Sequence, residues 1–455
     1  GMAAAAALCC ALGWVGPSPM ARLPLVRARP IATAERLQPL TARDLETCSW
    51  EIWPAHVFVV QGDLRRLSAD AVLYPTRDPS NAAWFPDGRP PDTTAPSWHD
   101  FTEEERVHKL QGLPASSQAV WLGHLNSKFA PIPQPNTPLS WFIAAAEQFL
   151  IAAQADLVES GRPPLNGRAR HLLALPVVGS GPMNARCVSG DILDALLGIL
   201  YAFASCSGMD VVLVAKSPRM FSAAQASRRQ LAALDVDITQ RQWCDMSRAQ
   251  LQTARRLARL ATNGELALFL GAGASAGAGL PEWNELLATL AADMLVGEAE
   301  VLAFRRLSAL DQALVLERRL GGPERLQQEV CRQLRASRHS LTHALLAALP
   351  VDGVVTTNYD DLFELACRGA GVEYNVLPYQ AGWNSDGSNR RGSDSPRAPK
   401  RWILKLHGCV HHPQDIVLTR TQMNEYADRR QALTGIVQAS MLTKHMLFVG
   451  FSLRD

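Results

Sequence analysis

The sequence predicts an α/β protein of two domains, the second of them built on a parallel sheet. Short apolar runs alternate with longer helical patterns along most of the chain, which is the order of elements in α/β domains. A chain of 455 residues is also longer than one core of ordinary size needs. We expect a leader over 1–49, a first domain over 50–240, a connecting helix over 241–263 and a second domain over 264–455.

The first domain consists of apolar runs separated by two long helical patterns. Strands that alternate with helices indicate a layered α/β domain. The segment 76–118 is rich in Pro, Asp and Ser and has no periodicity, so we expect a long surface loop there. The expected strands are 57–60, 71–75, 119–125, 171–178 and 210–216, and the expected helices are 141–158 and 191–204.

The second domain follows an amphipathic pattern over 243–262, whose apolar positions recur at helical spacing and predict the connecting helix. Beyond it, apolar runs again alternate with helical patterns, and 384–400 is a polar low-complexity loop. The expected strands are 266–271, 353–358, 403–408 and 446–451, with a helix over 283–296 and further helix up to 349.

The charge balance and the cysteine pattern argue against several function classes. With 45 basic and 43 acidic residues the formal net charge is +2, so no global field favours nucleic acid or an anionic membrane. No apolar run approaches the roughly 20 residues of a membrane-spanning helix. The nine cysteines form no C-x-x-C pair, which predicts a reducing compartment and no structural zinc or other metal.

Residues 1–34 have the composition of a targeting segment. They contain no Asp or Glu, include Arg22, Arg27 and Arg29, and begin with an Ala-rich apolar run. An organelle transit peptide has this composition. Met20 is an alternative start of translation, and a start there would exclude the whole of this run from the protein. We expect a cytoplasmic protein, with organellar import as the alternative if 1–34 is a transit peptide.

A strand followed by small residues opens the second domain. The segment LALFLGAGASAGAGLPEWNELL, 266–287, leads from an apolar run into GAGAS at 271–275, and a helical pattern resumes after Pro281. Such a turn lets backbone N–H groups approach a pyrophosphate at a helix N-terminus. It serves equally for close packing, and the small residues continue past the usual G-x-G-x-x-G spacing. Taken alone, the segment leaves a dinucleotide site and a packing turn both open.

Polar side chains follow three later apolar runs. Asn358 and Asp360 follow GVVTT, His407 lies at the end of ILKLHG, and Ser452 follows MLFVGF. Open parallel sheets bind ligands at the carboxyl ends of their strands. Asn and Asp also cap helices, and a lone His is more often a core or surface residue than a base. Four such segments in one order are much harder to explain in that way.

In this order the four segments resemble the Sir2 family, and its NAD-consuming, antiviral-defence branch more closely than its protein deacylases. The resemblance covers 264–455 and implies a Rossmann-like domain that binds NAD as its substrate. It implies that Asn358 and Asp360 position the nicotinamide and its ribose, that His407 is catalytic, and that the protein is a regulated homo-oligomer. The residues implied to bind the phosphates and the rest of NAD are Gly271, Ala272, Gly273, Ser275, Pro281, Trp283, Thr357, Gly450 and Ser452.

These residue types also suit cleavage of the nicotinamide–ribose bond. The pyridinium is already a good leaving group, so a protein needs mainly to bind the phosphates, orient the ring and stabilise an oxocarbenium-like state. Asn358 can hydrogen-bond a carboxamide or an attacking water, Asp360 can stabilise developing positive charge, and His407 can accept a proton. The reaction requires no metal.

Deacylation fits the sequence less well than hydrolysis of NAD. Deacylases of the family carry two zinc-binding C-x-x-C pairs beyond the catalytic His, and here Cys409 alone follows His407. We predict an NAD glycohydrolase that releases nicotinamide and ADP-ribose, and antiviral defence by NAD depletion is what the family implies. The alternatives are a catalytically idle NAD or ADP-ribose binding module that assembles into oligomers or filaments, and an NAD-dependent deacylase.

Two segments of the first domain, 62–76 and 174–182, resemble a macro domain, which implies a site for ADP-ribose or a cyclic ADP-ribose-like ligand. The sequence YPTR at 74–77 stands where macro domains usually have Asn-Ala-Ala-Asn, so hydrolysis of ADP-ribose is disfavoured and binding is left open. An α/β domain without a ligand and a Rossmann-like nucleotide sensor are the alternatives. The implied site residues are Asp63, Gly179, Ser180 and Gly181.

Overall fold

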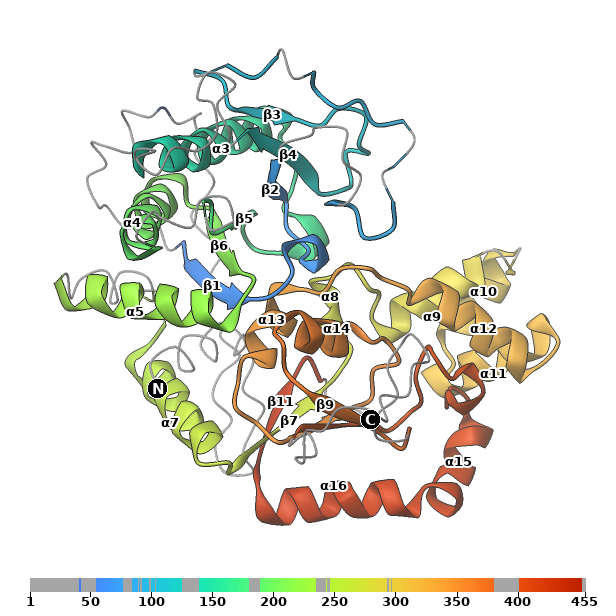
Figure 1. Ribbon diagram of the computed structural model, residues 1–455. Coiled ribbons are helices and arrows are strands. Elements are labelled where there is room, and N and C mark those ends of the chain that lie inside the picture. The colour runs from blue at the N-terminus through green and yellow to red at the C-terminus, as the bar shows by residue number, and fades with distance from the viewer. Residues whose placement is uncertain are drawn as a thin grey trace, which may run out of the picture. The chain divides into compact units, whose positions relative to one another are not determined.

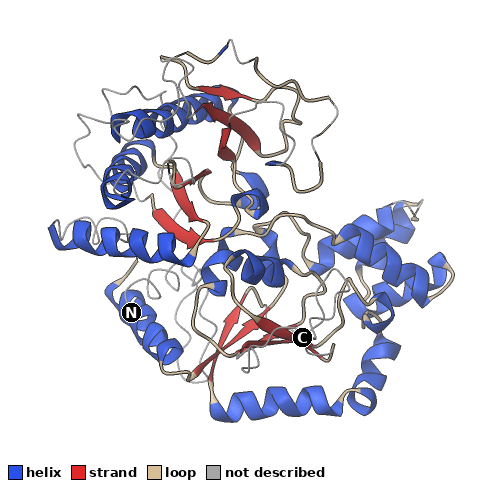
Figure 2. Cartoon of the chain, viewed as in Figure 1, coloured by secondary structure: helices blue, strands red, loops and turns tan. Residues whose placement is uncertain are grey.

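Contacts divide the computed structural model into two compact units. Described residues up to Arg248, together with Gly369–Gly371, belong to the N-terminal unit, and the other described residues to the C-terminal unit. Each unit has a sheet with helices packed on it (Figures 1 and 2). The predicted leader lies outside the described residues except for Thr41. The described residues are 41, 55–76, 84–88, 90, 92–97, 100–102, 104–124, 139–179, 189–234, 243, 246–292, 294–295, 297–379 and 401–451.

The N-terminal unit contains a six-stranded sheet in the order β1-β6-β5-β2-β4-β3. Neighbouring strands are parallel except for the edge strand β3, which is antiparallel to β4. Strands formed at all the expected runs, and the two helical patterns are α3 and α4. The strands are β1 (Val57–Gln61), β2 (Ala71–Thr76), β3 (Val107–Lys109), β4 (Ala119–His124), β5 (Leu172–Pro176) and β6 (Asp210–Ala215), and the helices are α3 (Leu139–Ser160), α4 (Ser189–Ser207) and α5 (Pro218–Leu234).

Two features of this unit differ from the sequence prediction. The segment 76–118, expected as a loop, contains β3 and an isolated bridge between Thr94 and Gln111, and it buries Phe101 and Leu110. A strand of three residues is too short to show alternation. The helix α5 was not predicted, because many of its apolar positions are alanines, which contrast weakly with their polar neighbours.

Within the described residues, α4 is the one helix long and apolar enough to cross a membrane. Its side chains Leu193, Leu197 and Leu200 are fully buried and belong to the core between the sheet and the helices. A helix that is covered on most of its surface needs an apolar composition for that reason alone. The composition of α4 is therefore explained by the core of the unit.

A buried carboxylate, Asp70, joins the amino end of β2 to the segment before β5. Its oxygens accept hydrogen bonds from the backbone N–H groups of Leu165 and Leu172, both at 2.7 Å, and Arg168 lies 3.4 Å away. Burial raises the pKa of this carboxyl, but the His171 ring at 3.3 Å and the hydrogen bonds from the two N–H groups outweigh it and hold the pKa below its usual value. Asp70 is therefore ionised in the folded chain at neutral pH.

We expect Asp70→Asn to lower the free energy of unfolding by about 2 kcal/mol at pH 7, because charge-assisted hydrogen bonds become neutral ones. A carboxyl with a depressed folded-state pKa contributes stability above its unfolded pKa of about 3.9 and loses it as the pH falls through the folded pKa. Urea unfolding of both proteins at pH 7 and near pH 3 measures this. The difference in free energy of unfolding between the wild type and Asp70→Asn should be smaller near pH 3 than at pH 7. An equal difference at both pH values contradicts an ionised Asp70.

The C-terminal unit contains a five-stranded sheet in the order β11-β7-β8-β10-β9, and every neighbouring pair is parallel. The four strands expected from the sequence are present, so the predicted parallel α/β sheet is confirmed. The edge strand β9 was not predicted, and its side chains are all half-buried, which hides an apolar pattern. The strands are β7 (Leu266–Leu270), β8 (Gly353–Thr356), β9 (Tyr374–Leu377), β10 (Arg401–Lys405) and β11 (His445–Val449).

Helices surround this sheet, and α9 to α12 form a separate group beside it (Figure 1). That group packs around Leu287, Leu316 and Val330, which are fully buried. The helices of the unit are α7 (Arg248–Thr262), α8 (Gly273–Ala276), α9 (Trp283–Ala292), α10 (Glu298–Arg305), α11 (Ala309–Leu320), α12 (Pro323–Gln333), α13 (Leu341–Ala347), α14 (Leu362–Gly369), α15 (Arg420–Arg429) and α16 (Gln431–Thr443).

The helix boundaries differ from the prediction in two places. The connecting helix α7 begins at Arg248 rather than at 243, after Ser247, a residue type that often precedes helices. The helix expected over 283–296 is α9, which ends at Ala292, and Gly297 is the N-cap residue of the next helix, α10. The helices α14, α15 and α16 were not predicted. The low-complexity loop 384–400 lies outside the described residues.

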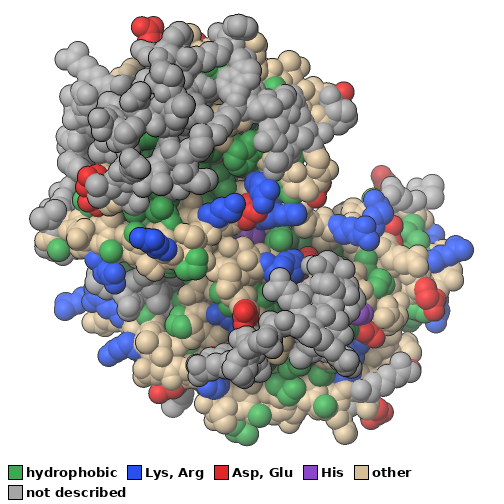
Figure 3. Space-filling model, in the orientation of Figure 1, with side chains coloured by type: hydrophobic (Ala, Val, Ile, Leu, Met, Phe, Trp, Pro, Cys, Tyr) green, Lys and Arg blue, Asp and Glu red, His purple; other side chains and the backbone are tan. Residues whose placement is uncertain are grey.

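Charged side chains of both signs are scattered among apolar ones on the face shown in Figure 3. Among the described residues, the large apolar side chains that are exposed lie in two places, on and just after α10 and at the end of α16. They are Leu302, Leu307, Met441 and Leu442.

Candidate active site

The strands β11, β7, β8 and β10 end level with one another in the C-terminal sheet. Gly450, Gly271, Asn358 and His407 each lie within two residues of the end of their own strand. The sheet therefore places residues from four separate predicted segments at one edge, where parallel sheets bind ligands. The last register pairs are Val449 with Leu270, Leu270 with Thr356, and Thr356 with Lys405.

The loops after β7 and β11 pack backbone against backbone. A Cβ atom at Gly450 would lie 2.1 Å from the backbone nitrogen of Ala274, and one at Gly271 would lie 2.5 Å from the carbonyl oxygen of Gly450. Gly450 also has a φ of 66°, a conformation that side chains other than glycine rarely adopt. Close packing alone therefore requires glycine at these two positions.

Most backbone N–H groups of the turn 271–275 are used inside the protein. Gly273 donates to the Gly450 carbonyl at 2.9 Å, Ala274 to the Gly271 carbonyl at 3.0 Å, and Ser275 to the Ala272 carbonyl at 2.9 Å. The N–H of Ala272 donates to none of the described residues. The predicted phosphate site therefore has one backbone amide in this turn that is available to a ligand, that of Ala272.

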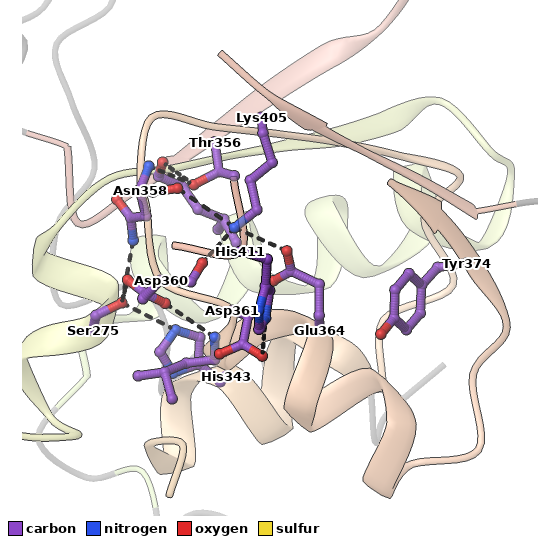
Figure 4. A network of polar contacts seen from close by, with 12 residues as sticks. Ser275, His343, Thr356, Asn358, Asp360, Asp361, Glu364, Tyr374, Lys405 and His411 are labelled. Atoms are coloured by element: carbon purple, nitrogen blue, oxygen red, sulfur yellow. Dashed lines mark hydrogen bonds and ion pairs between the residues drawn. The ribbon is translucent and has the colours of Figure 1, made fainter. Parts of the chain in front are cut away.

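The side chain of Asn358 has a fixed orientation. Its Nδ2 donates to the Gly271 carbonyl at 3.0 Å and to the Ser275 hydroxyl at 3.2 Å, the latter contact being drawn in Figure 4. Because a backbone carbonyl only accepts, Nδ2 must face the turn, and the carboxamide oxygen faces away from it. That oxygen accepts no hydrogen bond from the described residues. It is available as an acceptor for a ligand hydroxyl or a water.

Asp360 is buried, and both of its carboxylate oxygens are engaged. Oδ2 accepts from the Ser275 hydroxyl at 2.9 Å, and Oδ1 accepts from the backbone N–H of Leu362 at 3.0 Å. Burial raises the pKa of this carboxyl, against the opposing effect of Lys405. Asp360 therefore links the glycine turn to the start of α14. Ser275, implied by the resemblance to bind phosphate, directs its side chain to Asp360 and Asn358.

A buried histidine of α13, His343, lies behind Ser275. Its Nε2 is 3.5 Å from the Ser275 hydroxyl, and its Nδ1 accepts from the backbone N–H of Ser340 at 3.3 Å. Burial lowers the pKa of His343 to about 3, so the ring is neutral. Since Nδ1 accepts, the proton is on Nε2, which faces Ser275.

His407 is half-buried at the end of β10, and its ring meets the Tyr426 ring edge-on, with centroids 5.9 Å apart. Its backbone carbonyl accepts a hydrogen bond from the N–H of Val417 at 2.9 Å.

Of the other residues implied to bind NAD, Thr357 and Pro281 are half-buried, and so is Trp283, whose ring lies 6.1 Å from that of Tyr359. Ser452 lies outside the described residues.

Three buried residues of this network were not singled out in the sequence: Lys405, Glu364 and His343. Lys405 pairs with Glu364 at 2.8 Å between Nζ and Oε1. Lys405 is one of six lysines in the chain and stands inside an apolar strand. An ionisable residue at such a position usually has a buried partner, so the sequence did contain an indication. Glu364 and His343 lie on helices without a similar cue.

The candidate nucleotide residues of the N-terminal unit also follow strand ends. Asp63 comes after β1, and its carboxylate accepts from the Arg65 guanidinium, with Nη2 at 2.6 Å from Oδ2. Gly179 follows β5 and has a φ of 74°, and a Cβ there would lie 3.1 Å from the ring of Phe142. Ser180 and Gly181 lie outside the described residues. The macro-like site stays a prediction.

The described residues contain no group of three His, Cys, Asp or Glu side chains that could hold a metal ion. Cys331, Cys367 and Cys409 are free and buried, whereas Cys206 is disulfide-bonded, which the scattered cysteines had not indicated.

We expect less than a tenth of an equivalent of zinc in purified protein, because the nine cysteines form no C-x-x-C pair. Elemental analysis after dialysis tests this, and one zinc per chain would overturn it.

Residues 352–455 match the family model described as "SIR2-like domain". This segment is similar to SIR2-like domains. It includes Asn358, Asp360 and His407, and it begins after the glycine turn at 271–275. The resemblance to the Sir2 family predicted from the sequence is thereby confirmed for this segment.

The chain is also similar to curated proteins named "NAD(+) hydrolase ThsA". It is 27% identical over 201 residues to the one from Acinetobacter baumannii (strain 532279), 29% over 192 residues to the one from Cytobacillus dafuensis, and 28% over 195 residues to the one from Bacillus cereus (strain MSX-D12). The matched parts are 44%, 42% and 42% of this chain and 39%, 35% and 37% of the relatives. The chain thus spans well under half the length of these relatives.

Proposed function

We propose that the C-terminal unit is an NAD glycohydrolase, which hydrolyses NAD to nicotinamide and ADP-ribose. The observation that supports this most is the placement of Asn358 and His407 at the ends of the adjoining strands β8 and β10, beside the glycine turn after β7. Relatives named NAD(+) hydrolase match 192 to 201 residues of the chain. The site geometry and the relatives' names support the same chemistry.

In the proposed reaction the diphosphate of NAD lies at the turn 271–275, where the N–H of Ala272 is available. The bond between nicotinamide and ribose breaks with its electron pair passing to the pyridinium nitrogen, which leaves neutral nicotinamide and an oxocarbenium-like ribose. Water then forms a bond to C1′ and loses its proton to His407. The outward oxygen of Asn358 accepts a hydrogen bond from that water or from a ribose hydroxyl.

The products distinguish this activity from deacylation. The purified chain is incubated with NAD, with and without an acetyl-lysine peptide, and the products are separated by chromatography. We expect nicotinamide and ADP-ribose at the same rate in both reactions. Cleavage that occurs only with the peptide, and yields an acetylated ADP-ribose, contradicts the proposal and indicates a deacylase.

A catalytically idle module that binds NAD and assembles into oligomers is the second interpretation of the same site. Calorimetry followed by chromatography of the recovered nucleotide separates the two, because an idle module binds NAD and returns it intact. The presence of His407 together with Asn358 favours the enzyme, because binding of NAD alone requires no general base. We propose that the activity is regulated, that it acts in a homo-oligomer, and that it serves antiviral defence by depleting NAD.

We propose further that the N-terminal unit binds ADP-ribose or a cyclic ADP-ribose-like nucleotide at the carboxyl ends of β1 and β5. Asp63 and Gly179 follow those ends, and the partly exposed Arg65 beside Asp63 supplies a cation for a phosphate. Gly179→Glu is unsuitable as a test, since any side chain there is strained. Arg65→Glu reverses the charge with less disturbance of the backbone.

Titration calorimetry of the full chain carrying His407→Ala, with and without Arg65→Glu, tests this second site without consuming NAD. ADP-ribose, cyclic ADP-ribose and NAD are titrated in turn. We expect heat from at least one of them beyond that of the NAD site, and its loss in the Arg65→Glu protein. Absence of any such heat indicates that the N-terminal unit has no nucleotide site of this kind.

A further inference from the structure

The buried ion pair of Lys405 and Glu364 lies directly beneath the turn that carries Asn358 and Asp360. Lys405 is the last residue of β10, and Glu364 lies in the first turn of α14. Their side chains are 1% and 4% exposed, so no bulk water screens the charges. Burial disfavours the ammonium, but the Glu364 carboxylate outweighs it and raises the pKa of Lys405. Burial also raises the pKa of the Glu364 carboxyl, against the opposing effect of Lys405.

Lys405 reaches the backbone of the active-site turn as well as its counter-ion. Its Nζ donates to the carbonyl oxygen of Asn358 at 3.4 Å and, through a short contact, to that of Asp360. An ammonium has three donors, and here the three acceptors are these two carbonyls and Glu364. Figure 4 shows Lys405 directed at this cluster from the strand side. One side chain thus fixes both ends of the segment 358–360.

A buried ion pair is a costly way to stabilise a core. Apolar side chains of similar volume are often as stable or more so, because they avoid removing two charges from water. The contacts of Lys405 with the two carbonyls explain why a charged group is present, since an apolar side chain cannot bind them. The direction in which Asn358 presents its carboxamide depends on where these carbonyls are held.

We propose that Lys405 is a positioning residue that holds the 358–360 turn in its reactive conformation, with Glu364 as its counter-ion. This inference rests on the proposed NAD hydrolysis for its kinetic consequences. Lys405 does not itself contact NAD in this account. A shift of the turn by about 1 Å is enough to cost on the order of 100-fold in rate.

Three variants separate positioning from stability. Lys405→Met removes the ammonium and leaves the Glu364 carboxyl buried without its partner, so we expect a lower Tm. Lys405→Met/Glu364→Leu replaces the pair with apolar side chains, and its Tm should recover. Lys444→Met is the matched control, because Lys444 donates to the Gly264 carbonyl at the other end of the sheet. Its activity should equal that of the wild type.

We expect kcat and kcat/KM for nicotinamide release to fall together, by about 10-fold to 100-fold, in both Lys405 variants. The decisive result is the double variant, which should regain Tm without regaining kcat. If it regains both, the pair is purely structural and the proposal is wrong. If Lys405→Met fails to fold, the double variant still gives this answer.

The positioning role has a readout that does not depend on turnover. A crystal structure of the double variant should show the 358–360 turn displaced and the contact between Asn358 Nδ2 and the Gly271 carbonyl lost. An unchanged turn overturns the proposal whether or not the wild type cleaves NAD. A wild type that releases no nicotinamide, by contrast, counts against the proposed function, and the position of the turn then decides the inference alone.

Discussion

Asn358→Ala and His407→Ala are each expected to lower the rate of NAD cleavage by about 100-fold to 1,000-fold while the chain stays folded. Both side chains lie at strand ends, half-buried, and neither belongs to a hydrophobic core. Asn358→Ala removes the outward acceptor, and His407→Ala removes the proposed base. Nicotinamide release by the purified variants, with circular dichroism to check folding, measures the effect.

Matched controls exist at the opposite end of the same sheet. Asn263 is exposed before β7, and His445 is exposed at the start of β11. Asn263→Ala and His445→Ala make the same chemical changes away from the site, and wild-type rates are expected for both. Wild-type turnover in Asn358→Ala and His407→Ala would refute the site assignment.

Gly450→Ala is expected to destabilise the C-terminal unit by about 3 kcal/mol and to weaken NAD binding, because the new methyl group collides with backbone rather than with a movable side chain. Its Cβ would lie 2.1 Å from the Ala274 nitrogen, and the residue has a φ of 66°. The turn 271–275 must move to make room. Urea unfolding and calorimetry with NAD measure the two effects.

Gly435→Ala provides the control for this substitution. Gly435 lies within α16, and a Cβ there meets nothing within 4 Å. Alanine in a helix interior is favoured over glycine, so we expect a gain of about 0.5 to 1 kcal/mol. If Gly450→Ala is as stable as wild type, the backbone packing of the two loops does not constrain the turn in solution.

The sequence predicts the fold best where apolar residues recur with one spacing, that of a strand or of a helix, along a long segment. Apolar runs such as 57–60 and 266–271 became buried strands because both faces of a parallel sheet are covered. Short or half-exposed elements escaped prediction: β3 has three residues, and the side chains of β9 are all half-buried. In those elements tertiary contacts, rather than the local pattern, determine the conformation.

The part of the candidate site that lies at strand ends could be predicted from the sequence. Asn358 and His407 follow adjoining parallel strands, and parallel strands end at one edge. The role of Ser275 was not predictable, because its hydroxyl turns inward to Asp360 rather than to the exposed side of the turn. The pair of Lys405 with Glu364 was missed because nothing in a sequence pattern shows which residue of a helix faces a buried lysine.

The most direct test of this account is the fate of NAD in the presence of the purified wild-type chain. NAD, nicotinamide and ADP-ribose are quantified over time by chromatography, with and without added ADP-ribose or cyclic ADP-ribose as candidate regulators. We expect NAD to disappear while nicotinamide and ADP-ribose appear in equal amounts. NAD recovered intact under all of these conditions, from a folded protein that binds it, would contradict the proposed hydrolysis.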